Sequence, residues 1–313
     1  MPLTHPGPRD WLARLPTLKT AYTRTAALLL AFVFGALIPQ AHVANFMIRW
    51  MVMTMLYLVF LNTPLSGLSL RRSQFLLFAA NIAMGFAGWC VGFAVGGREL
   101  ALALFFAGIA PTATAAPVVI SFLRGRVDYV VTVFLLTNLL VAMAMPFMLP
   151  IVLGHATGPV FLHILGSVVI VVFAPTALAW LTRTAHPDAV SWPPKLRNFS
   201  FAIWVGTLFL VTSNASFFLR NQSVIPVATI ATIGALSALL CAGNFALGRF
   251  VGRPDFRREA SQALGQKNTT FTIYLALTYA NPLVALGPTF YVLWHNIWNS
   301  WQLHRAAVKD RNA

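Results

Sequence analysis

Acidic residues are scarce in this sequence. Only seven of its 313 residues are Asp or Glu, and charged residues of both signs make up 9% of the chain. A soluble domain needs charge on its surface, so this scarcity excludes an ordinary water-soluble protein. Instead, 58% of the residues are hydrophobic, and the mean hydropathy is +0.74. With its many apolar runs of about 20 residues, the sequence predicts an all-helical protein embedded in a lipid bilayer.

Cysteine is also rare, with only Cys90 and Cys241 in the whole chain. Both lie in apolar runs without the spacing of metal ligands, so we interpret them as small buried hydrophobic residues. An intramembrane enzyme such as a prenyltransferase would need paired aspartates or a cluster of the His-Glu-His type at a membrane face. The sequence has neither. We therefore expect no enzymatic activity, no metal centre and no cofactor.

Basic residues dominate the charge, and the formal net charge is +15. Their distribution indicates membrane topology and not nucleic-acid binding. With successive spans running in alternate directions, 18 of the 22 Lys and Arg fall on the side of the termini. Only Arg98 and Arg220 fall on the other side, while Arg49 and Lys267 lie within spans. This asymmetry predicts a multi-pass protein of the cell inner membrane with both termini in the cytoplasm. The ten predicted spans cover residues 25–40, 45–63, 73–96, 99–122, 127–154, 158–182, 198–218, 223–248, 260–281 and 284–303.

The predicted spans divide evenly, with five before Gly154 and five after it. An odd number in each half means that the halves are inserted in opposite orientations, which is typical of inverted-repeat transporters. The first 24 residues are basic and contain proline, so we interpret the first apolar stretch as a retained span and not as a cleaved signal. The predicted organisation is a cytoplasmic N-terminal segment at 1–24, five-helix repeats at 25–154 and 155–304, and a cytoplasmic tail at 305–313.

Local similarity between the halves supports the repeat. The fourth and ninth predicted spans each follow an Arg-Glu pair and carry a polar motif, "GIAPTATAAPV" and "ALGQKNTTF". The spans that come next each hold an asparagine within an apolar run, Asn138 and Asn296. Any two membrane halves share some features of this kind, so the similarity alone does not establish a repeat.

The motif of the fourth span contains Pro111 and Pro117, and each removes a backbone donor and clashes with the preceding turn. Thr112 and Thr114 lie between them and can bond the freed carbonyls. Two prolines around a Thr-Ala-Thr run indicate a helix that is interrupted where it lines a cavity. The alternative is a helix that is only kinked and packed.

The motif of the ninth span places six non-apolar residues in succession, from Gly265 to Thr270. On a regular helix such a cluster would occupy every side, so it could not face lipid. Either the helix is broken here, or polar neighbours surround it. Both interpretations place the segment inside the protein, where broken helix ends attract ions.

Lys267 is the most informative residue of this motif. A charged lysine at this depth costs about 3 kcal/mol on insertion scales, and all seven acidic residues lie at span ends or in loops. Its ammonium could instead reach the surface, be capped by helix carbonyls, or be neutral. The first alternative fits poorly, because the surface is about 13 Å away and the side chain spans about half of that. We favour a functional role.

Other polar residues within spans carry less weight. Asn81 and Asn244 could point into the protein, although single asparagines often only bridge helices. Tyr291, His295 and Asn299 lie four residues apart on one face of the tenth span, and Asn296 lies beside them. This stripe is equally consistent with a packing network and with a site.

The two motifs and the five-plus-five arrangement resemble the bile acid:sodium symporter family over most of residues 25–303. The resemblance implies that the fourth and ninth spans are unwound and cross in the middle of the membrane. It also implies a panel domain of helices 1, 2, 6 and 7, and a core domain of helices 3–5 and 8–10. Members of this family move organic anions, such as bile acids and small carboxylates, together with two sodium ions by alternating access.

The family's sodium ligands are largely replaced here. Its ninth span reads Glu-x-Gly-x-Gln-Asn, and in this register the Glu is Ala263 and the Gln is Lys267, while the Gly and Asn match. Asn81 stands where the family has a glutamine in the third span. The other ligand positions fall on residues unable to bind a cation, namely Ala116, Pro117, Val130 and Phe134.

These replacements predict that the ammonium of Lys267 occupies the place of a sodium ion. The expected function is transport of a small organic anion without sodium. A permanently charged Lys267 implies facilitated diffusion or exchange, and one that loses and regains its proton implies proton symport. The alternatives are a sodium-coupled symporter and an exporter of metalloids or other solutes. We expect a monomer in the bilayer, and no nucleic-acid partner.

The predicted site residues fall into three groups. Substrate contacts are expected from Lys267, Asn268, Thr269, Thr112 and Thr114. Coupling or replacement of the cation is assigned to Lys267, Gln266 and Asn81. Secondary candidates are Asn138, His295, Asn296 and Asn299.

Overall fold

The computed structural model describes residues 18–62, 70–155, 157–221 and 226–311, and this part of the chain is helical throughout, with no strands. The first half contains α1 (Leu18–Leu37), η2 (Pro39–Ala44), α2 (Met47–Asn62), α3 (Arg72–Ile109), α4 (Ala115–Phe122) and α5 (Val127–Val152). The second half begins with α6 (Gly158–Val168), η3 (Val169–Phe173), α7 (Ala174–Ala185), η4 (Pro187–Ser191) and α8 (Trp192–Lys195). It continues with α9 (Arg197–Asn221), α10 (Val227–Val251), α11 (Arg257–Gly265), α12 (Thr269–Tyr279) and α13 (Pro282–Arg311).

The predicted membrane location agrees with the lengths and the apolar surfaces of these helices. Among the described residues, five helical stretches are long and apolar enough to cross a bilayer. Large apolar side chains also point outward along them, including Phe147, Leu162 and Leu239, which are 62%, 64% and 68% exposed. Such surfaces are stable only in an apolar solvent. The five stretches are Arg72–Ile109, Val127–Val152, Gly158–Ala185, Asn198–Asn221 and Val227–Val251.

The longest helix, α3, is a hairpin of two packed halves. Its backbone leaves helical geometry at Gly96 and Gly97, and Gly97 has a φ of 75°, which suits glycine. The two halves then approach through glycine: a Cβ added to Gly92 would lie 2.6 Å from the Cα of Ala101. Such close contact needs residues without side chains. α3 thus contains the third predicted span and the first part of the fourth, which continues past the end of α3 into α4.

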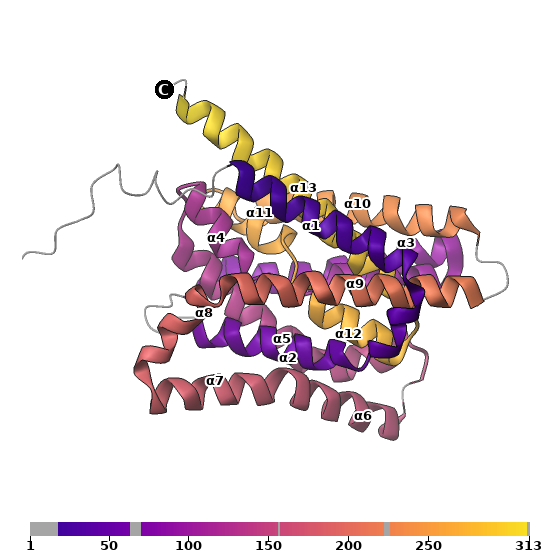
Figure 1. The fold of residues 1–313 in the computed structure, drawn as a ribbon. Helices are drawn as coiled ribbons and strands as arrows, with labels where there is room; N and C mark the ends of the chain where they lie inside the picture. Colours follow the sequence, from indigo (N-terminus) through magenta and orange to yellow (C-terminus); the bar gives the residue numbers. More distant parts are fainter. Residues whose placement is uncertain (1–17, 63–69, 156, 222–225, 312–313) are drawn as a thin grey trace, which may run out of the picture.

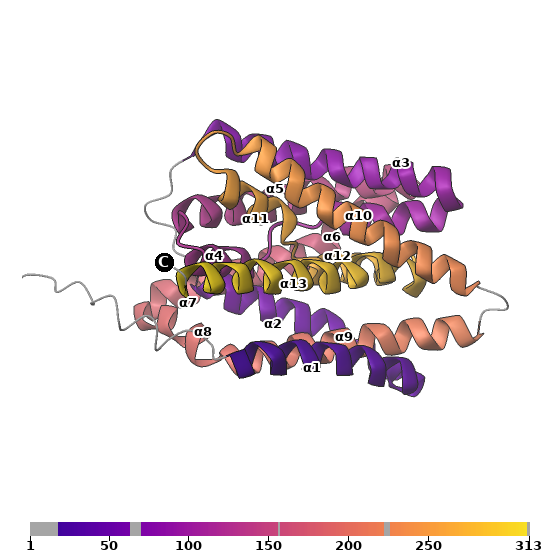
Figure 2. The same ribbon diagram turned by 90° about the horizontal axis from the view of Figure 1, so that it is seen from above.

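The helices run roughly along one common direction. The start of α1 and the end of α13 lie at the same end of the bundle (Figures 1 and 2). Figure 2 shows α1 and α9 side by side along one edge, with α3 and α10 at the opposite edge. α12 and α13 lie between them. The largest apolar cluster joins α2, α3, α5, α9 and α12 across this middle layer.

The boundaries of two predicted segments differ from the structure or fall outside it. α13 continues to Arg311, so most of the segment predicted as a tail at 305–313 is helical. Of the N-terminal segment predicted at 1–24, residues 1–17 lie outside the described part of the chain. α1 already begins at Leu18, so the last seven residues of that predicted segment are helical.

Candidate functional site

Two breaks in the helices meet inside the protein. The first separates α3, which ends at Ile109, from α4, and the second separates α11, which ends at Gly265, from α12. At the meeting point Thr112 and Lys267 form an isolated antiparallel bridge. The backbone N–H of Ala113 donates to the carbonyl of Gln266 at 2.8 Å. The backbone N–H of Asn268 donates to the carbonyl of Pro111 at 2.7 Å. Each broken segment thus supplies hydrogen-bond partners for backbone groups of the other.

The local sequence explains why the breaks fall here. Pro111 has no backbone donor, so a continuous helix would be interrupted at this point in any case. In the second segment, the C-terminal end of α11 leaves carbonyls without helical partners. Two of these are capped by side chains from elsewhere in the fold. The hydroxyl of Thr112, in the first broken segment, donates to the carbonyl of Ala263 at 2.7 Å, and the hydroxyl of Tyr291, on α13, donates to that of Gly265 at 2.9 Å. The predicted interruption of both spans is present, and the broken ends are in contact.

Lys267 lies at the centre of this crossing and is 2% exposed. Its Nζ donates a hydrogen bond to Oδ1 of Asn81, which comes from the first half of α3. The amide nitrogen of Asn81 in turn donates to the carbonyl of Ile109, the last residue before the first break, at 2.8 Å. Asn81 is 1% exposed, so the pair is shielded from solvent. The side chain of Lys267 therefore points into the protein and not toward the surface.

α5 contributes a second set of polar groups to the crossing. The amide nitrogen of Asn138 donates to the carbonyl of Thr112 at 2.9 Å, and its Oδ1 accepts a longer bond of 3.4 Å from the side chain of Asn268. The hydroxyl of Thr137 accepts the backbone N–H of Thr112 at 3.2 Å. These bonds hold the unwound segment around Thr112 against α5. Asn138 therefore takes part in the polar contacts of the crossing.

α11 and α13 form a neighbouring polar cluster. Nε2 of Gln262 donates to Oδ1 of Asn299 at 2.8 Å and to Oε1 of Gln266 at 2.5 Å. His295 packs edge-on against Tyr291, with ring centroids 5.8 Å apart, and its buried Nδ1 has no partner among the described residues. The stripe on the tenth span therefore packs against the ninth span, and Tyr291 and Asn299 make its polar contacts.

Several predicted residues take no direct part in the crossing. Thr114 is exposed and caps no backbone group of α4 with its side chain. The amide of Asn296 donates to Val292 within its own helix, at 2.7 Å. Thr269 is 3% exposed, and its carbonyl accepts the hydroxyl of Thr272 at 3.1 Å. The structure thus brings together Lys267, Asn268, Asn81, Thr112 and Asn138, with Gln266 beside them.

The positions that matched sodium ligands in the family pattern are packed with apolar side chains. Ala116, Val130 and Ala263 are each 0% exposed, and all belong to one hydrophobic cluster. Phe134, one turn after Val130 on α5, is 2% exposed. A sodium ion needs several oxygen ligands, and this region offers methyl and phenyl groups in their place. Among the described residues, no three His, Cys, Asp or Glu side chains are close enough together to hold a metal ion.

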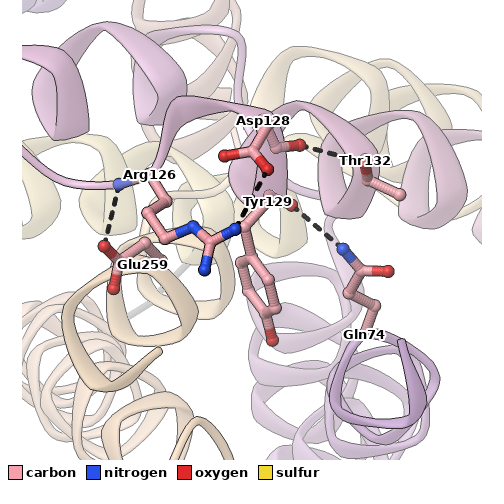
Figure 3. A network of polar contacts seen from close by, with 6 residues as sticks. All are labelled: Gln74, Arg126, Asp128, Tyr129, Thr132 and Glu259. Atoms are coloured by element: carbon pink, nitrogen blue, oxygen red, sulfur yellow. Dashed lines mark hydrogen bonds and ion pairs between the residues drawn. The ribbon is translucent and has the colours of Figure 1, made fainter. Parts of the chain in front are cut away.

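A polar network lies at the α4–α5 connection, near the start of α11 (Figure 3). Glu259 is 7% exposed, and its Oε1 accepts the backbone N–H of Arg126 at 2.9 Å. The guanidinium of Arg126 lies 3.8 Å from the carboxylate of Asp128, and Gln74 donates to the carbonyl of Tyr129 at 3.5 Å. This network fixes α11 to α5 and α3. It supports the crossing and offers no free acidic group to Lys267.

Sequence reasoning gave no role to Thr137, Gln262 or Arg49. Thr137 directly precedes Asn138, and Gln262 stands one turn before Gln266, so both carry a polar signal close to residues that were identified. Arg49 was noted only as a basic residue within a span. Its Nε is buried without a hydrogen-bond partner among the described residues. Its surroundings come from a helix more than 200 residues away, which the sequence alone does not indicate.

Comparison with known proteins assigns no family to this chain. The sequence matches no known protein-family profile, and a search of curated proteins finds no similar chain. Function is therefore inferred from the geometry of the crossing and from the motifs that form it.

Proposed function

We propose that this protein is a secondary transporter that moves a small organic anion across the membrane by alternating access, without sodium, with Lys267 in the place of a sodium ion. The observation that carries the proposal is the buried bond between the ammonium of Lys267 and Asn81, made where two broken helices cross. Buried ionisable groups at mid-membrane depth are costly and are found at substrate and ion pathways. Crossed broken helices are the usual setting of such sites in transporters.

The proposed architecture is ten spans in two inverted repeats of five. The bonds at the crossing support it, because they are reciprocal: the residue after Thr112 donates to the residue before Lys267, and the residue after Lys267 donates to the residue before Thr112. Every antiparallel bridge has this reciprocal pattern, and a two-fold axis in the membrane plane, which relates inverted repeats, is compatible with it. α3 supplies the third span and, after its hairpin at Gly96 and Gly97, the first half of the fourth span, which α4 completes.

The two edges of the bundle correspond to the two proposed domains. α1, α2, α9 and the α6–α7 stretch form the panel, and α3, α4, α5 and α10–α13 form the core that carries the crossing. Contacts between helices favour this division, since α1 packs on α9 and α2 packs on α7, while α10 packs on α3, α11 and α13. Relative movement of the panel and the core would expose the crossing to each side in turn. We place both termini in the cytoplasm, at the inner membrane, from the distribution of basic residues.

Two observations support the proposed replacement of sodium by Lys267, namely the charge at the crossing and the apolar packing around it. The ammonium supplies one positive charge at the crossing, and Asn81 supplies an oxygen to it. The remaining cation-ligand positions are apolar and filled. The positive end of α12, which begins at Thr269 beside Lys267, adds to the attraction for an anion. In this proposal the chain carries its own cation. The proposed similarity to the bile acid:sodium symporter family then covers the fold and the anionic substrate but not the ion.

Uptake into proteoliposomes tests this proposal. Purified protein is reconstituted and supplied with a panel of labelled carboxylates and sterol acids, under an imposed sodium gradient, an imposed pH gradient or neither. We expect uptake of at least one anion that is unchanged when potassium replaces sodium. Faster uptake under a pH gradient identifies proton symport, and equal uptake identifies facilitated diffusion or exchange. Uptake that requires sodium would refute replacement of the ion by Lys267.

A further inference from the structure

A second cationic site lies away from the crossing, in a pocket between α2 and α12. The pocket has a volume of about 390 Å³ and is lined by Asn45, Phe46, Ile48, Arg49, Trp50, Tyr274, Leu277 and Thr278. Its residues come from the start of α2 and from the last turns of α12, at the end of the bundle away from the start of α1 (Figure 1). A volume of this size suits a small organic molecule.

Arg49 is the one charged residue that lines this pocket. The buried Nε of its guanidinium has no hydrogen-bond partner among the described residues, and no described carboxylate pairs with it. An arginine in this state retains one donor that is removed from water and still lacks an acceptor, which is costly unless a ligand supplies one. The planar guanidinium matches the two oxygens of a carboxylate.

The rest of the lining completes an amphipathic site. Asn45 and Thr278 add polar side chains beside Arg49, and Tyr274 adds a phenol that is 8% exposed. Phe46, Trp50 and Leu277 supply an apolar wall. Such a lining would hold the charged group of a ligand at one side and its hydrocarbon or aromatic body at the other.

We propose that this pocket binds the carboxylate of an amphipathic organic anion, with Arg49 as the residue that recognises the charge. Identification of this ligand with the transported substrate rests on the proposed function, whereas binding of an anion here does not. α2 belongs to the proposed panel and α12 to the proposed core. A bound anion would therefore bridge the two. Tyr274, the first lining residue on α12, stands about 7.5 Å along that helix from its first residue, Thr269, by the rise of five residues.

Equilibrium binding in nanodiscs of dioleoylphosphatidylcholine tests the site. Labelled phenylacetate is the probe, and unlabelled phenylacetate and its neutral analogue phenylacetamide are the competitors. We expect phenylacetate to compete at least about tenfold better, because a charge-assisted bond is lost in the amide. Arg49→Gln should abolish this preference. Arg220→Gln, which removes an exposed arginine that caps Ala36, should retain it.

Further variants and lipids keep the test decisive. If Arg49→Gln does not fold, Arg49→Lys keeps the charge without the planar fork, and its preference should fall below that of the wild type. An unchanged preference in either variant overturns the proposal. So does loss of phenylacetate binding when dioleoylphosphatidylglycerol is added to the nanodiscs, because a lipid phosphate would then be the ligand. No flux is measured, so failure of the proposed transport function would leave this result standing.

Discussion

Nζ of Lys267 donates a hydrogen bond to Oδ1 of Asn81, which is 186 residues away in the sequence. The same asparagine amide donates to the carbonyl of Ile109, where the helical bonding of α3 ends. One side chain therefore satisfies both the buried ammonium and the end of a broken helix. This relationship makes Asn81 the partner on which the crossing depends.

Removal of the amide should destabilise the protein through the charge it leaves behind. In Asn81→Leu, the ammonium of Lys267 loses its acceptor, and we expect a loss of about 1.5–3 kcal/mol, the range for hydrogen bonds to charged groups. The measurement is the free energy of unfolding in detergent, obtained by thermal or chemical denaturation. Asn81→Leu combined with Lys267→Met should be more stable than Asn81→Leu alone, because both partners of the buried bond are then absent. Equal stability of the two would show that the bond contributes little.

The hydroxyl of Thr112 should be a structural contact between the two broken segments. Thr112→Val keeps the shape of the side chain and removes the bond of 2.7 Å to the carbonyl of Ala263. We expect a loss of about 1–3 kcal/mol, because a buried acceptor is left unpaired. Thr114→Val is the matched control: this threonine is exposed, and the change should remain within about 0.5 kcal/mol. A similar loss in both variants would contradict the assigned contact.

Close approach of α10 to the second break requires glycine at position 265. A Cβ added there would lie 2.3 Å from the ring of Phe245, which cannot be accommodated without movement. We expect Gly265→Ala to cost about 1–3 kcal/mol in unfolding measurements, as overpacking does. Gly166→Ala places its new methyl group in open space on α6 and should cost nothing. If Phe245→Leu fails to rescue Gly265→Ala, the cost arises elsewhere than at this ring.

The helices and both breaks could be predicted because their causes are local. Apolar runs set the spans, and Pro111 and the polar run from Gly265 to Thr270 set the interruptions. The partner of Lys267 was harder to identify, because Asn81 is one of many single asparagines and is distant in sequence. The pairing of α2 with α12 that encloses Arg49 is a tertiary contact with no local signal. The exposure of Thr114 could not be predicted, because its neighbours in the motif do not determine which side chains turn inward.

The central claim is that Lys267 supplies the positive charge that a sodium ion would otherwise bring to the crossing. The most direct measurement is the initial rate of anion uptake by wild type and by Lys267→Ala in proteoliposomes, with external sodium and with N-methylglucamine in its place. We predict equal wild-type rates in the two media, and loss of uptake in Lys267→Ala in both. Wild-type uptake that stops when sodium is removed, or Lys267→Ala that transports at the wild-type rate, would contradict the account.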